Sequence, residues 1–457
     1  MRVRRTTANG VLTCSVIAAS YEVAKHQNTE NSANNAWNVN MSNGNVNNNN
    51  KNNMYHVRPV SADAEYRMFE LTIWEAYYDC LKGKKSCKQA LEYMSIAHED
   101  VPRLAYEIWT GVYKPSPSTC FMVTFPKYRE VFAAAFRDRI VHHWICLRLN
   151  PLFEERHISL GNVSHACRKG FGTRTAIGQA EENIMRVSEG YTKSAWVCKD
   201  DVVGFFMNIE KAIMWRMLHE LVTEQYHGDH KEVLLRLTEI TVMNRPEQGC
   251  ILNSPVEMWQ FLDSGKSLFG TDGKRGMPIG NLTTQLEAGY FMSFFDEAVA
   301  RVFKGRNYGY TRSTDDIVIV CDDKDFMLKA VKVLHRWARI YLHIRFHEDK
   351  VCIQPVAHGV KFLGQWIKPY RRYTINRTVG RFEDKVKQCV RECEDGITPI
   401  RQEYWVQVFN SYFGFLAQTR SYRIRRHIKS LLTDEWYRYF ILVNNRKIKA
   451  RQKVWKR

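Results

Sequence analysis

The sequence predicts an α+β fold in which a short antiparallel sheet lies among helices. Two apolar, β-prone segments, 308–314 and 317–321, are separated only by a tight acidic connection and predict neighbouring strands. Segment 281–303 repeats apolar residues at helical spacing, and so does the basic segment 326–339. From about residue 378 the chain is again helical in pattern and basic.

The first 60 residues differ from the rest of the chain. Asparagine dominates residues 31–53, a composition that offers no apolar face to bury, so we expect a disordered extension over 1–60. Residues 11–19 are apolar and follow three arginines, as in a secretion signal, but the run is short and interrupted. The twelve cysteines have no paired spacing. We therefore expect reduced thiols and a cytoplasmic protein.

The middle of the chain mixes helix and strand patterns. Residues 66–109 have helical periodicity, and residues 128–149 also have a helix-like pattern. A loop-rich insert over 246–276 precedes the helix that begins at 281. Further strands are expected around 344–353 and 360–367.

The positive charge is concentrated at the C-terminal end. Of a net charge of +19, most lies in residues 360–457, which hold 23 Lys and Arg against eight Asp and Glu. Such one-sided charge indicates a polyanionic partner, either nucleic acid or an anionic membrane surface. No apolar run approaches the ~18 residues of a membrane span. Residues 446–457 contain seven cations and no acid, as expected for a flexible RNA-binding arm.

Asp315 and Asp316 are the first candidates for chemistry. Adjacent carboxylates repel unless a cation lies between them, and oxygen ligands alone suit Mg²⁺ or Mn²⁺. In isolation a solvated acidic turn is the simpler explanation, and Asp322 with Asp323 shows that such pairs are common. Asp201 strengthens the metal interpretation, because it ends an apolar strand and is costly to bury unpaired. We expect Asp201 to meet Asp315 across a sheet, in a two-metal site.

Two glycine-containing loops accompany the acids. In GKRGMPIGNLTTQ, Gly276 and Gly280 precede a helix whose free backbone N–H groups suit close approach of a substrate. A helix entry capped by Asn281 is the alternative. In ACRKGFGTRTAI, Arg168, Lys169 and Arg174 flank Gly170 and Gly172, which suits either a mobile phosphate-binding loop or a solvated basic one.

In this order the segments resemble a reverse transcriptase, over about residues 121–428. The matching segments are FMVTFPKYREVFAAAFRDRIVHHW, ACRKGFGT, DVVGFFMNI, IGNLTTQ, HEDK, VKFLGQWI and NSYFGFL. The resemblance implies a right-hand polymerase, with N-terminal helices and fingers over 61–200 and a palm, an antiparallel sheet with helices, over 201–370. Residues 210–280 would complete the fingers, and 371–457 would form a basic helical thumb and tail.

The resemblance also assigns site residues. Catalysis would fall to Asp201, Asp315 and Asp316, which with Val202 would ligate two Mg²⁺ ions, Mn²⁺ being possible. Phe206 lies where the family excludes a ribose 2′-OH. The implied nucleotide-binding residues are Arg168, Lys169, Phe205, Phe206, Ile279, Gly280, Gln285 and Lys350. The implied nucleic-acid-binding residues are Lys127, Arg129, Leu363, Gly364, Arg423, Arg425, Arg426 and Lys429.

The IGNLTTQ segment resembles one subgroup, the reverse transcriptases of diversity-generating retroelements. Most family members begin this motif with Gln-Gly and end it with Ser-Pro, whereas this chain has Ile279 and Gln285. In the subgroup the aliphatic residue accompanies misincorporation opposite template adenine, since it cannot hydrogen-bond the nucleotide. Ser313 stands where the family has Tyr, so a ring that would pack on the template–primer is missing. Thr284 stands where the family has Ser, which is a mild change.

The subgroup implies particular partners. They are a template-repeat RNA, the RNA–cDNA hybrid, deoxynucleoside triphosphates and a small helical accessory protein that forms a pentameric barrel, with no membrane. The Asn-rich segment resembles the variable region of the lectin-like proteins that these elements diversify. Residues 1–60 would then derive from the template repeat, with a start at Met54 or Met68. A genuine disordered extension is the alternative.

Two other functions stay open. One is a reverse transcriptase of the group II intron or defence-associated type, although the sequence shows no Cys/His nuclease signature. The other is an RNA-binding polymerase relic, inactive because of Ser313, although the three acidic residues are retained.

Overall fold

The computed structural model describes residues 35–39, 46–50, 60–84, 87–124 and 127–451. The chain divides into two compact units, Met1–Met68 and Phe69–Arg457.

In the first unit, β1 (Asn35–Val39) pairs with β2 (Val46–Asn50) in an antiparallel sheet. The disorder that we expected over residues 1–60 stays a prediction, although these two segments pair. Backbone pairing satisfies N–H and C=O groups without requiring an apolar face, so the composition did not reveal it. The remaining residues of the Asn-rich segment lie outside the described residues.

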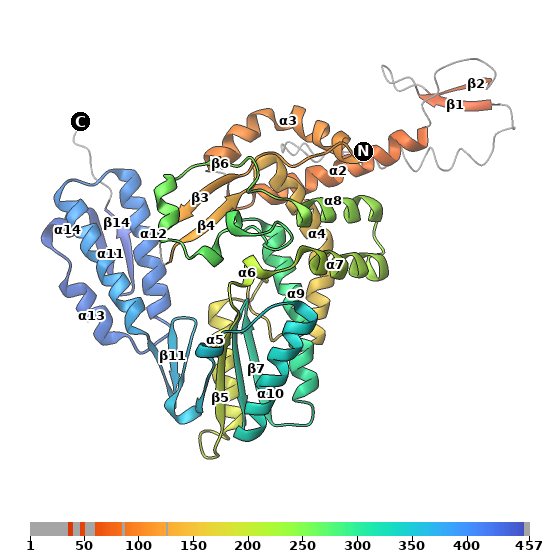
Figure 1. The fold of residues 1–457 in the computed structure, drawn as a ribbon. Helices are drawn as coiled ribbons and strands as arrows, with labels where there is room; N and C mark the ends of the chain where they lie inside the picture. Colours follow the sequence, from red (N-terminus) through yellow and green to blue (C-terminus); the bar gives the residue numbers. More distant parts are fainter. Residues whose placement is uncertain (1–34, 40–45, 51–59, 85–86, 125–126, 452–457) are drawn as a thin grey trace, which may run out of the picture. The chain divides into compact units, whose positions relative to one another are not determined.

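Helices and strands are mixed along the chain, which confirms the expected α+β class (Figure 1). The α-helices are α2 (Val60–Leu81), α3 (Lys88–Trp109), α4 (Phe136–Ser159), α5 (Thr173–Val187), α6 (Phe205–Asn208), α7 (Lys211–Gln225), α8 (Lys231–Met243), α9 (Leu282–Val302), α10 (Lys324–Trp337), α11 (Asn376–Glu394), α12 (Pro399–Leu416), α13 (Tyr422–Ser430) and α14 (Asp434–Tyr439). None of the described helices is both long and apolar enough to span a bilayer.

Short helical turns and further strands complete the second unit. The turns are η1 (Val256–Phe261), η2 (Ser264–Lys266), η3 (Leu268–Gly270), η4 (Ala338–Leu342), η5 (Glu348–Lys350) and η6 (Val356–His358). The strands are β3 (Thr119–Val123), β4 (Arg129–Ala133), β5 (Trp196–Asp201), β6 (Ile251–Leu252), β7 (Tyr308–Ser313), β8 (Asp316–Cys321), β9 (Cys352–Pro355), β10 (Val360–Phe362), β11 (Gln365–Lys368), β12 (Arg371–Thr374), β13 (Phe440–Val443) and β14 (Lys447–Ala450).

Four antiparallel strands in the order β7-β8-β5-β9 form the central sheet. Helix α5 contacts β7 and β8, whereas α10 contacts β5 and α9 (Figure 1). Val197 of β5 and Val318 of β8 are buried in the same apolar cluster as α5. Side chains alternate between the two faces of a strand, so Lys199 and Asp201 lie on the face of Val197, and Asp200 lies on the opposite face.

β7 and β8 form the expected hairpin. Their bounds agree with the predicted strands to within one residue, and Ser313 pairs with Asp316 across a two-residue turn. Thr314 in that turn has φ 58°, in the left-handed region. On the outer side of β7, Arg312 N donates to Val163 O at 2.8 Å, and His165 N donates to Arg312 O at 2.9 Å.

The C-terminal region has its own apolar core. The buried members of that core include Phe382, Trp405, Phe409, Phe413, Trp436, Phe440 and Ile448. We expected helices here and a flexible tail over 446–457, but β13 and β14 pair as a hairpin. Asn444 and Asn445 in its turn have φ 50° and 53°, a conformation that Asn tolerates, and they were the sequence signal for it. Residues 452–457 lie outside the described residues.

Three other expectations were corrected or confirmed. Residues 66–109 are helical as expected and form α2 and α3, with Gly83 at φ 70° in the break between them. Residues 128–149 begin with strand β4, which pairs with β3, before α4 starts at Phe136. The helix expected at 281–303 is α9, and the described cysteines are free and mostly buried. Domain boundaries at residues 200 and 370 stay predictions.

Candidate active site

Three carboxylates meet at one end of the central sheet. The register of β5 and β8 places Asp201 directly opposite Asp316, not opposite Asp315 as we expected. Asp315 occupies the turn that follows, one position further along. The difference arises because the strands end together at the 201–316 pair, and a one-residue step in register moves a side chain to the other face.

The carboxylates influence one another electrostatically. Burial, together with the neighbouring carboxylates of Asp201 and Asp316, raises the pKa of Asp315 to about 6. Burial also raises the pKa of Asp316, where Lys199 acts in the opposite direction and Asp201 in the same one. Lys199 Nζ lies 3.6 Å from Asp316 Oδ1. Negative charge at this end of the sheet is therefore only partly compensated.

Asp200 is separated from this group although it is adjacent in sequence. It lies on the other face, where its Oδ2 lies 2.6 Å from His335 Nε2 on α10. It is buried, and the His335 ring stacks on Phe346 at 4.6 Å. The alternation of the strand thus selects Asp201, and not Asp200, for the acidic end.

Val202 presents a backbone carbonyl to the same region. It forms an antiparallel bridge with Phe346, flanked by hydrogen bonds from Val203 N to Arg345 O and from His347 N to Asp201 O. In this pattern the paired residues direct their own N–H and C=O groups away from each other. The Val202 carbonyl therefore faces the β8 side, where Asp315 follows the last strand pair.

The donor set fits a hard divalent cation, because it consists of carboxylate and carbonyl oxygens. Among the described side chains, however, no three His, Cys, Asp or Glu residues already stand in a metal-ligand arrangement. Carboxylates without a cation between them repel, so close convergence is not expected before a metal binds. The structure places Asp201 opposite Asp316, with Asp315 in the adjoining turn, and a metal site formed by them with Val202 stays a prediction.

Three of the predicted nucleotide-binding residues lie in or beside a small apolar cluster. Phe206 and Ile279 are partly buried against the same cluster, which includes Phe132 and Leu268. Phe205 is buried and meets the Phe206 ring edge-on at 5.2 Å. The predicted nucleotide-binding residues Phe205, Phe206 and Ile279 therefore come together from segments about 70 residues apart in the sequence.

Gly280 is required by its surroundings. It has φ 131°, and a Cβ atom at this position would lie 2.5 Å from Phe132 O. The preceding carbonyl, Ile279 O, accepts a hydrogen bond from Phe132 N at 2.8 Å. The loop that carries Ile279 is thereby fixed against β4.

Arg168 does not have the position that we expected of a triphosphate ligand. Its side chain is buried, forms an ion pair with Glu154 at 2.8 Å, and donates to Ser164 O and Asn162 Oδ1. The contact with Glu154 anchors the loop to α4, and the other two hold the loop together. A buried guanidinium with satisfied partners has little to offer a ligand, so Arg168 positions the loop instead.

The other predicted nucleotide-binding residues are more open. Lys169 and Gln285 are exposed, and Cys167 Sγ lies 3.6 Å from Gln285 Oε1. Lys350 ends η5, and its side chain lies outside the described residues.

Two predicted nucleic-acid-binding cations face the acids. Lys127 and Arg129, both exposed, lie at the start of β4, and their charges lower the pKa of Asp316 and Asp315 respectively, against the effect of burial. Leu363 and Gly364 form the turn between β10 and β11, with φ 45° and 82°. A Cβ atom on Gly364 would lie 3.1 Å from Phe415 on α12, so this turn needs glycine.

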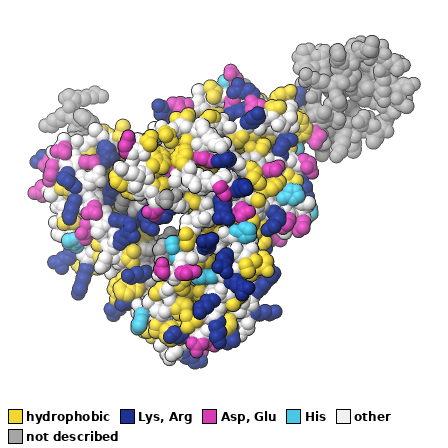
Figure 2. All heavy atoms as spheres, viewed as in Figure 1, with side chains coloured by type: hydrophobic (Ala, Val, Ile, Leu, Met, Phe, Trp, Pro, Cys, Tyr) yellow, Lys and Arg dark blue, Asp and Glu magenta, His cyan; other side chains and the backbone are white. Residues whose placement is uncertain are grey.

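The predicted cations of α13 lie on one side of that helix. Ile428 is buried on the opposite side, whereas Arg423, Arg426 and Lys429 are exposed. Arg425 is half-buried, and burial with nearby Arg446 lowers its pKa. In the face shown in Figure 2, Lys and Arg side chains are frequent over the C-terminal helices.

Sequence reasoning missed a buried ion pair behind the hairpin. Arg312 and Asp296 are both fully buried, with Nη2 and Oδ2 2.6 Å apart. Tyr310 donates its hydroxyl to Asp296 Oδ1 at 2.7 Å. The signal available was a basic residue within an apolar strand, which is costly unless a partner exists.

Comparisons with known proteins were limited. No protein-family model matches the chain, and no curated protein matches it. Among solved structures it is similar to three telomerases. One is Candida tropicalis apo telomerase truncated from the C-terminal domain, with 12% identity and a TM-score of 0.39, where the match covers 57% of this chain and 56% of that one. Another is Candida albicans telomerase with a TWJ fragment of telomeric RNA, with 10% identity, a TM-score of 0.41 and coverage of 71% of this chain and 63% of that one. The third is Candida tropicalis apo telomerase, with 10% identity, a TM-score of 0.42 and coverage of 71% and 62% respectively. The chain spans 56–63% of the length of these telomerases. The function therefore rests on the site itself.

Proposed function

We propose that the chain is an RNA-directed DNA polymerase that extends a primer with deoxynucleoside triphosphates. The observation that carries this proposal is the pairing of Asp201 with Asp316 at the end of an antiparallel sheet, with Asp315 in the adjoining turn. Carboxylates in this arrangement suit two-metal phosphoryl transfer, in which positioning and charge stabilisation supply most of the catalysis.

Two Mg²⁺ ions, or Mn²⁺, would be held by Asp201, Asp315, Asp316 and the Val202 carbonyl. When bound, such ions lower the pKa of a primer 3′-hydroxyl and neutralise the triphosphate. The chain's own cations add to this charge balance, because Lys127 and Arg129 already face the acidic group.

Phe206 and Ile279 would form the wall against the incoming nucleotide. An aromatic ring fixed by Phe205 leaves no room for a ribose 2′-OH, which favours deoxynucleotides. Ile279 offers no hydrogen bond to the nucleotide, so a mismatched base loses less there than it would beside a Gln side chain.

The narrower proposal is mutagenic copying of a template-repeat RNA at adenines, for targeted protein diversification, with a small barrel-forming accessory protein. Ile279 and Gln285 support it. Replacing Ile279 by Gln and sequencing the cDNA tests it: errors opposite adenine should fall in I279Q and be frequent in the wild type. Faithful copying by the wild type would instead favour the group II intron or defence-associated type.

Primer extension on an RNA template tests the enzyme proposal itself. The double variant Asp315→Ala with Asp316→Ala should make no cDNA. Asp322→Ala is the matched control, since this exposed acid follows the opposite end of β8 from Asp316. Synthesis that persists in the double variant would refute the assignment.

The same assay decides the second candidate, an RNA-binding relic. Ser313 favours it, since the pairing partner of Asp316 on β7 carries no ring. A wild-type chain that binds RNA but extends no primer under any divalent metal would establish the relic.

A further inference from the structure

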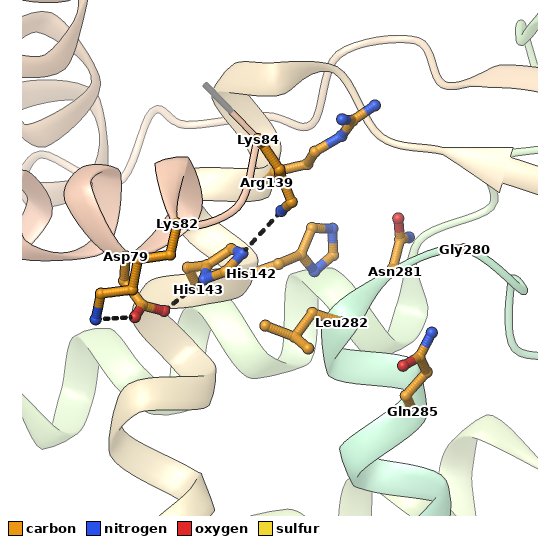
Figure 3. Close-up of a pocket in the computed structure, with 10 residues that line it drawn as sticks. All are labelled: Asp79, Lys82, Lys84, Arg139, His142, His143, Gly280, Asn281, Leu282 and Gln285. Carbon is orange, nitrogen blue, oxygen red and sulfur yellow. Dashed lines mark hydrogen bonds and ion pairs between the residues drawn. The ribbon is translucent and has the colours of Figure 1, made fainter. Parts of the chain in front are cut away.

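A cavity of about 430 Å³ lies outside the acidic group. Figure 3 shows that three parts of the chain border it: the end of α2 with the turn after it, α4, and the start of α9. The residues that matter for its chemistry are Lys84, Arg139, His142, Asn281 and Gln285. Its volume is within the range of small-ligand sites and exceeds that of a single phosphate group.

The cavity has an excess of positive charge. Its one carboxylate, Asp79, is already occupied, with Lys82 Nζ at 2.8 Å and His143 Nδ1 at 2.7 Å (Figure 3). Among the residues that the structure describes, Lys84 and Arg139 have no carboxylate partner. Lys84 Nζ lies 3.4 Å from His143 Nε2, and Arg139 contacts only neutral groups, Ala134 O and Gln89 Oε1. Two cations therefore border the cavity without a counter-charge.

The start of α9 adds to this potential. The Asn281 side chain does not cap the helix, because its Oδ1 accepts a hydrogen bond from Ala134 N at 3.4 Å. The first-turn N–H groups of a 21-residue helix are thus left without a side-chain acceptor. An anion beside Leu282 would satisfy them.

His142 provides a neutral donor or acceptor at the same place. His142 is 7% exposed, and its Nδ1 lies 2.9 Å from Thr283 Oγ1. Burial, together with the charges of His143 and Arg139, lowers the pKa of His142 to about 4. The ring is uncharged at neutral pH, so the positive charge of the cavity comes from Lys84 and Arg139.

We propose that this cavity binds a backbone phosphate of a single-stranded RNA. A phosphodiester suits two cations and free helix N–H groups, and the remaining volume accommodates the attached ribose. Gly280 and Gln285 border this cavity and also belong to the segment proposed to bind the nucleotide. A strand held in the cavity would therefore enter the active site from this side. The identity of the strand as RNA rests on the proposed function; the phosphate chemistry does not.

The test is RNA binding without synthesis. Full-length chain is titrated into a labelled single-stranded RNA at several salt concentrations, with no nucleotide or divalent metal present. Lys84→Gln and Arg139→Gln should each weaken binding roughly tenfold, as removal of a charge-assisted hydrogen bond does. The slope of log K against log salt should become shallower by about 0.7 for each phosphate that the variant no longer neutralises.

Lys88→Gln is the matched control. Lys88 starts α3, is exposed, and already pairs with Glu92 at 3.7 Å, so its replacement should leave the binding unchanged. Lys84→Gln keeps the test valid if Arg139→Gln fails to fold, because Lys84 contacts only a histidine ring. Arg139→Lys should retain most of the affinity.

Two further titrations separate the possible sources of the phosphate. Inorganic phosphate should compete with RNA for the wild-type protein but not for Lys84→Gln. The affinity for dTTP should be equal in the wild type and in Lys84→Gln. Equal RNA affinity in Lys84→Gln, Arg139→Gln and Lys88→Gln would overturn the proposal. A weakening confined to dTTP would overturn the strand assignment. Because no synthesis is measured, an inactive polymerase would leave this result unaffected.

Discussion

Arg312 and Asp315 lie three residues apart on one hairpin, yet their charges are treated in opposite ways. Arg312 is fully buried, and Asp296 receives two of its nitrogens at 2.6 Å. Asp315 and Asp316 are half-buried, with only Lys199 within ion-pair distance of them among the described residues. A buried charge is tolerated when it is paired, so the charge of Arg312 is neutralised, whereas the charges of Asp315 and Asp316 are only partly compensated.

Asp315→Asn should have the largest effect on activity with no loss of stability, and so distinguish the acidic end of the hairpin from the Arg312 end. DNA synthesis should fall roughly 10³-fold or more, because metal ligation supplies several kcal/mol of transition-state stabilisation. The folded state should not lose stability, since the raised pKa of Asp315 shows that its charge is unfavourable there. Primer extension and thermal melting on the same sample measure both. A large fall in melting temperature would mean that Asp315 is structural.

Asp296→Asn should have the opposite profile. It leaves the Arg312 charge buried without a counter-charge, which costs about 3–5 kcal/mol of unfolding free energy. Urea unfolding measures this loss. The double change Asp296→Leu with Arg312→Met removes both charges and should recover most of it. If the double variant is no more stable than Asp296→Asn, the pair is not the source of the loss.

Glu287 on α9 provides an unpaired buried acid for comparison. It is 1% exposed, neither carboxylate oxygen has a hydrogen-bond partner, and burial raises its pKa to about 8. Between its usual pKa and 8 the folded state holds a proton that the unfolded state has lost. Stability due to this group therefore falls by about 1.4 kcal/mol per pH unit as pH rises in that window.

Glu287→Gln should remove this dependence. Unfolding at pH 6 and pH 7 should then differ less in the variant than in the wild type, and the variant should be more stable at pH 7. Below the usual pKa of a glutamate, the two proteins should converge. A wild type whose stability rises between pH 6 and 7, with no difference from the variant, would contradict the buried neutral form.

Lys199→Ala should have the smallest effect. Both partners of its contact with Asp316 are about one-third exposed, so the stability change should be below about 1 kcal/mol. Removing Lys199 would raise the pKa of Asp316 further, and the acid limb of the pH–activity profile should move to higher pH. Lys193→Ala, which removes an exposed pair with Glu189, is the control for a nonspecific charge effect.

The hairpin and its acids were predictable because the information is local. Apolar, β-prone residues predict strands 308–314 and 317–321, and the tight connection between them predicts their pairing. Asp201 was found for the same reason, as an acid that ends an apolar strand. The choice between Asp200 and Asp201 follows from alternation once Val197 is known to be buried.

The remaining features depend on contacts between distant segments. Arg168 and Lys169 look alike in sequence, but only Arg168 meets Glu154, and this partner decides that it is buried. Arg312 likewise depends on Asp296 in another helix. The cavity beside Arg139 is lined by residues of α2, α4 and α9, so it cannot be predicted from any single segment of the sequence. Long-range pairing of charges, and not local propensity, is what the sequence conceals.

The pairing of residues 163–165 with β7 has one more consequence, for solubility. β7 is the outer strand of the central sheet, and an outer strand offers backbone groups to which another chain can add. The hydrogen bonds between Arg312 and the loop close this edge beside the acidic turn. Because Arg168 anchors that loop through Glu154, replacing it would uncover a template for sheet growth between molecules. The residue expected to hold a nucleotide thus helps to keep this sheet edge covered.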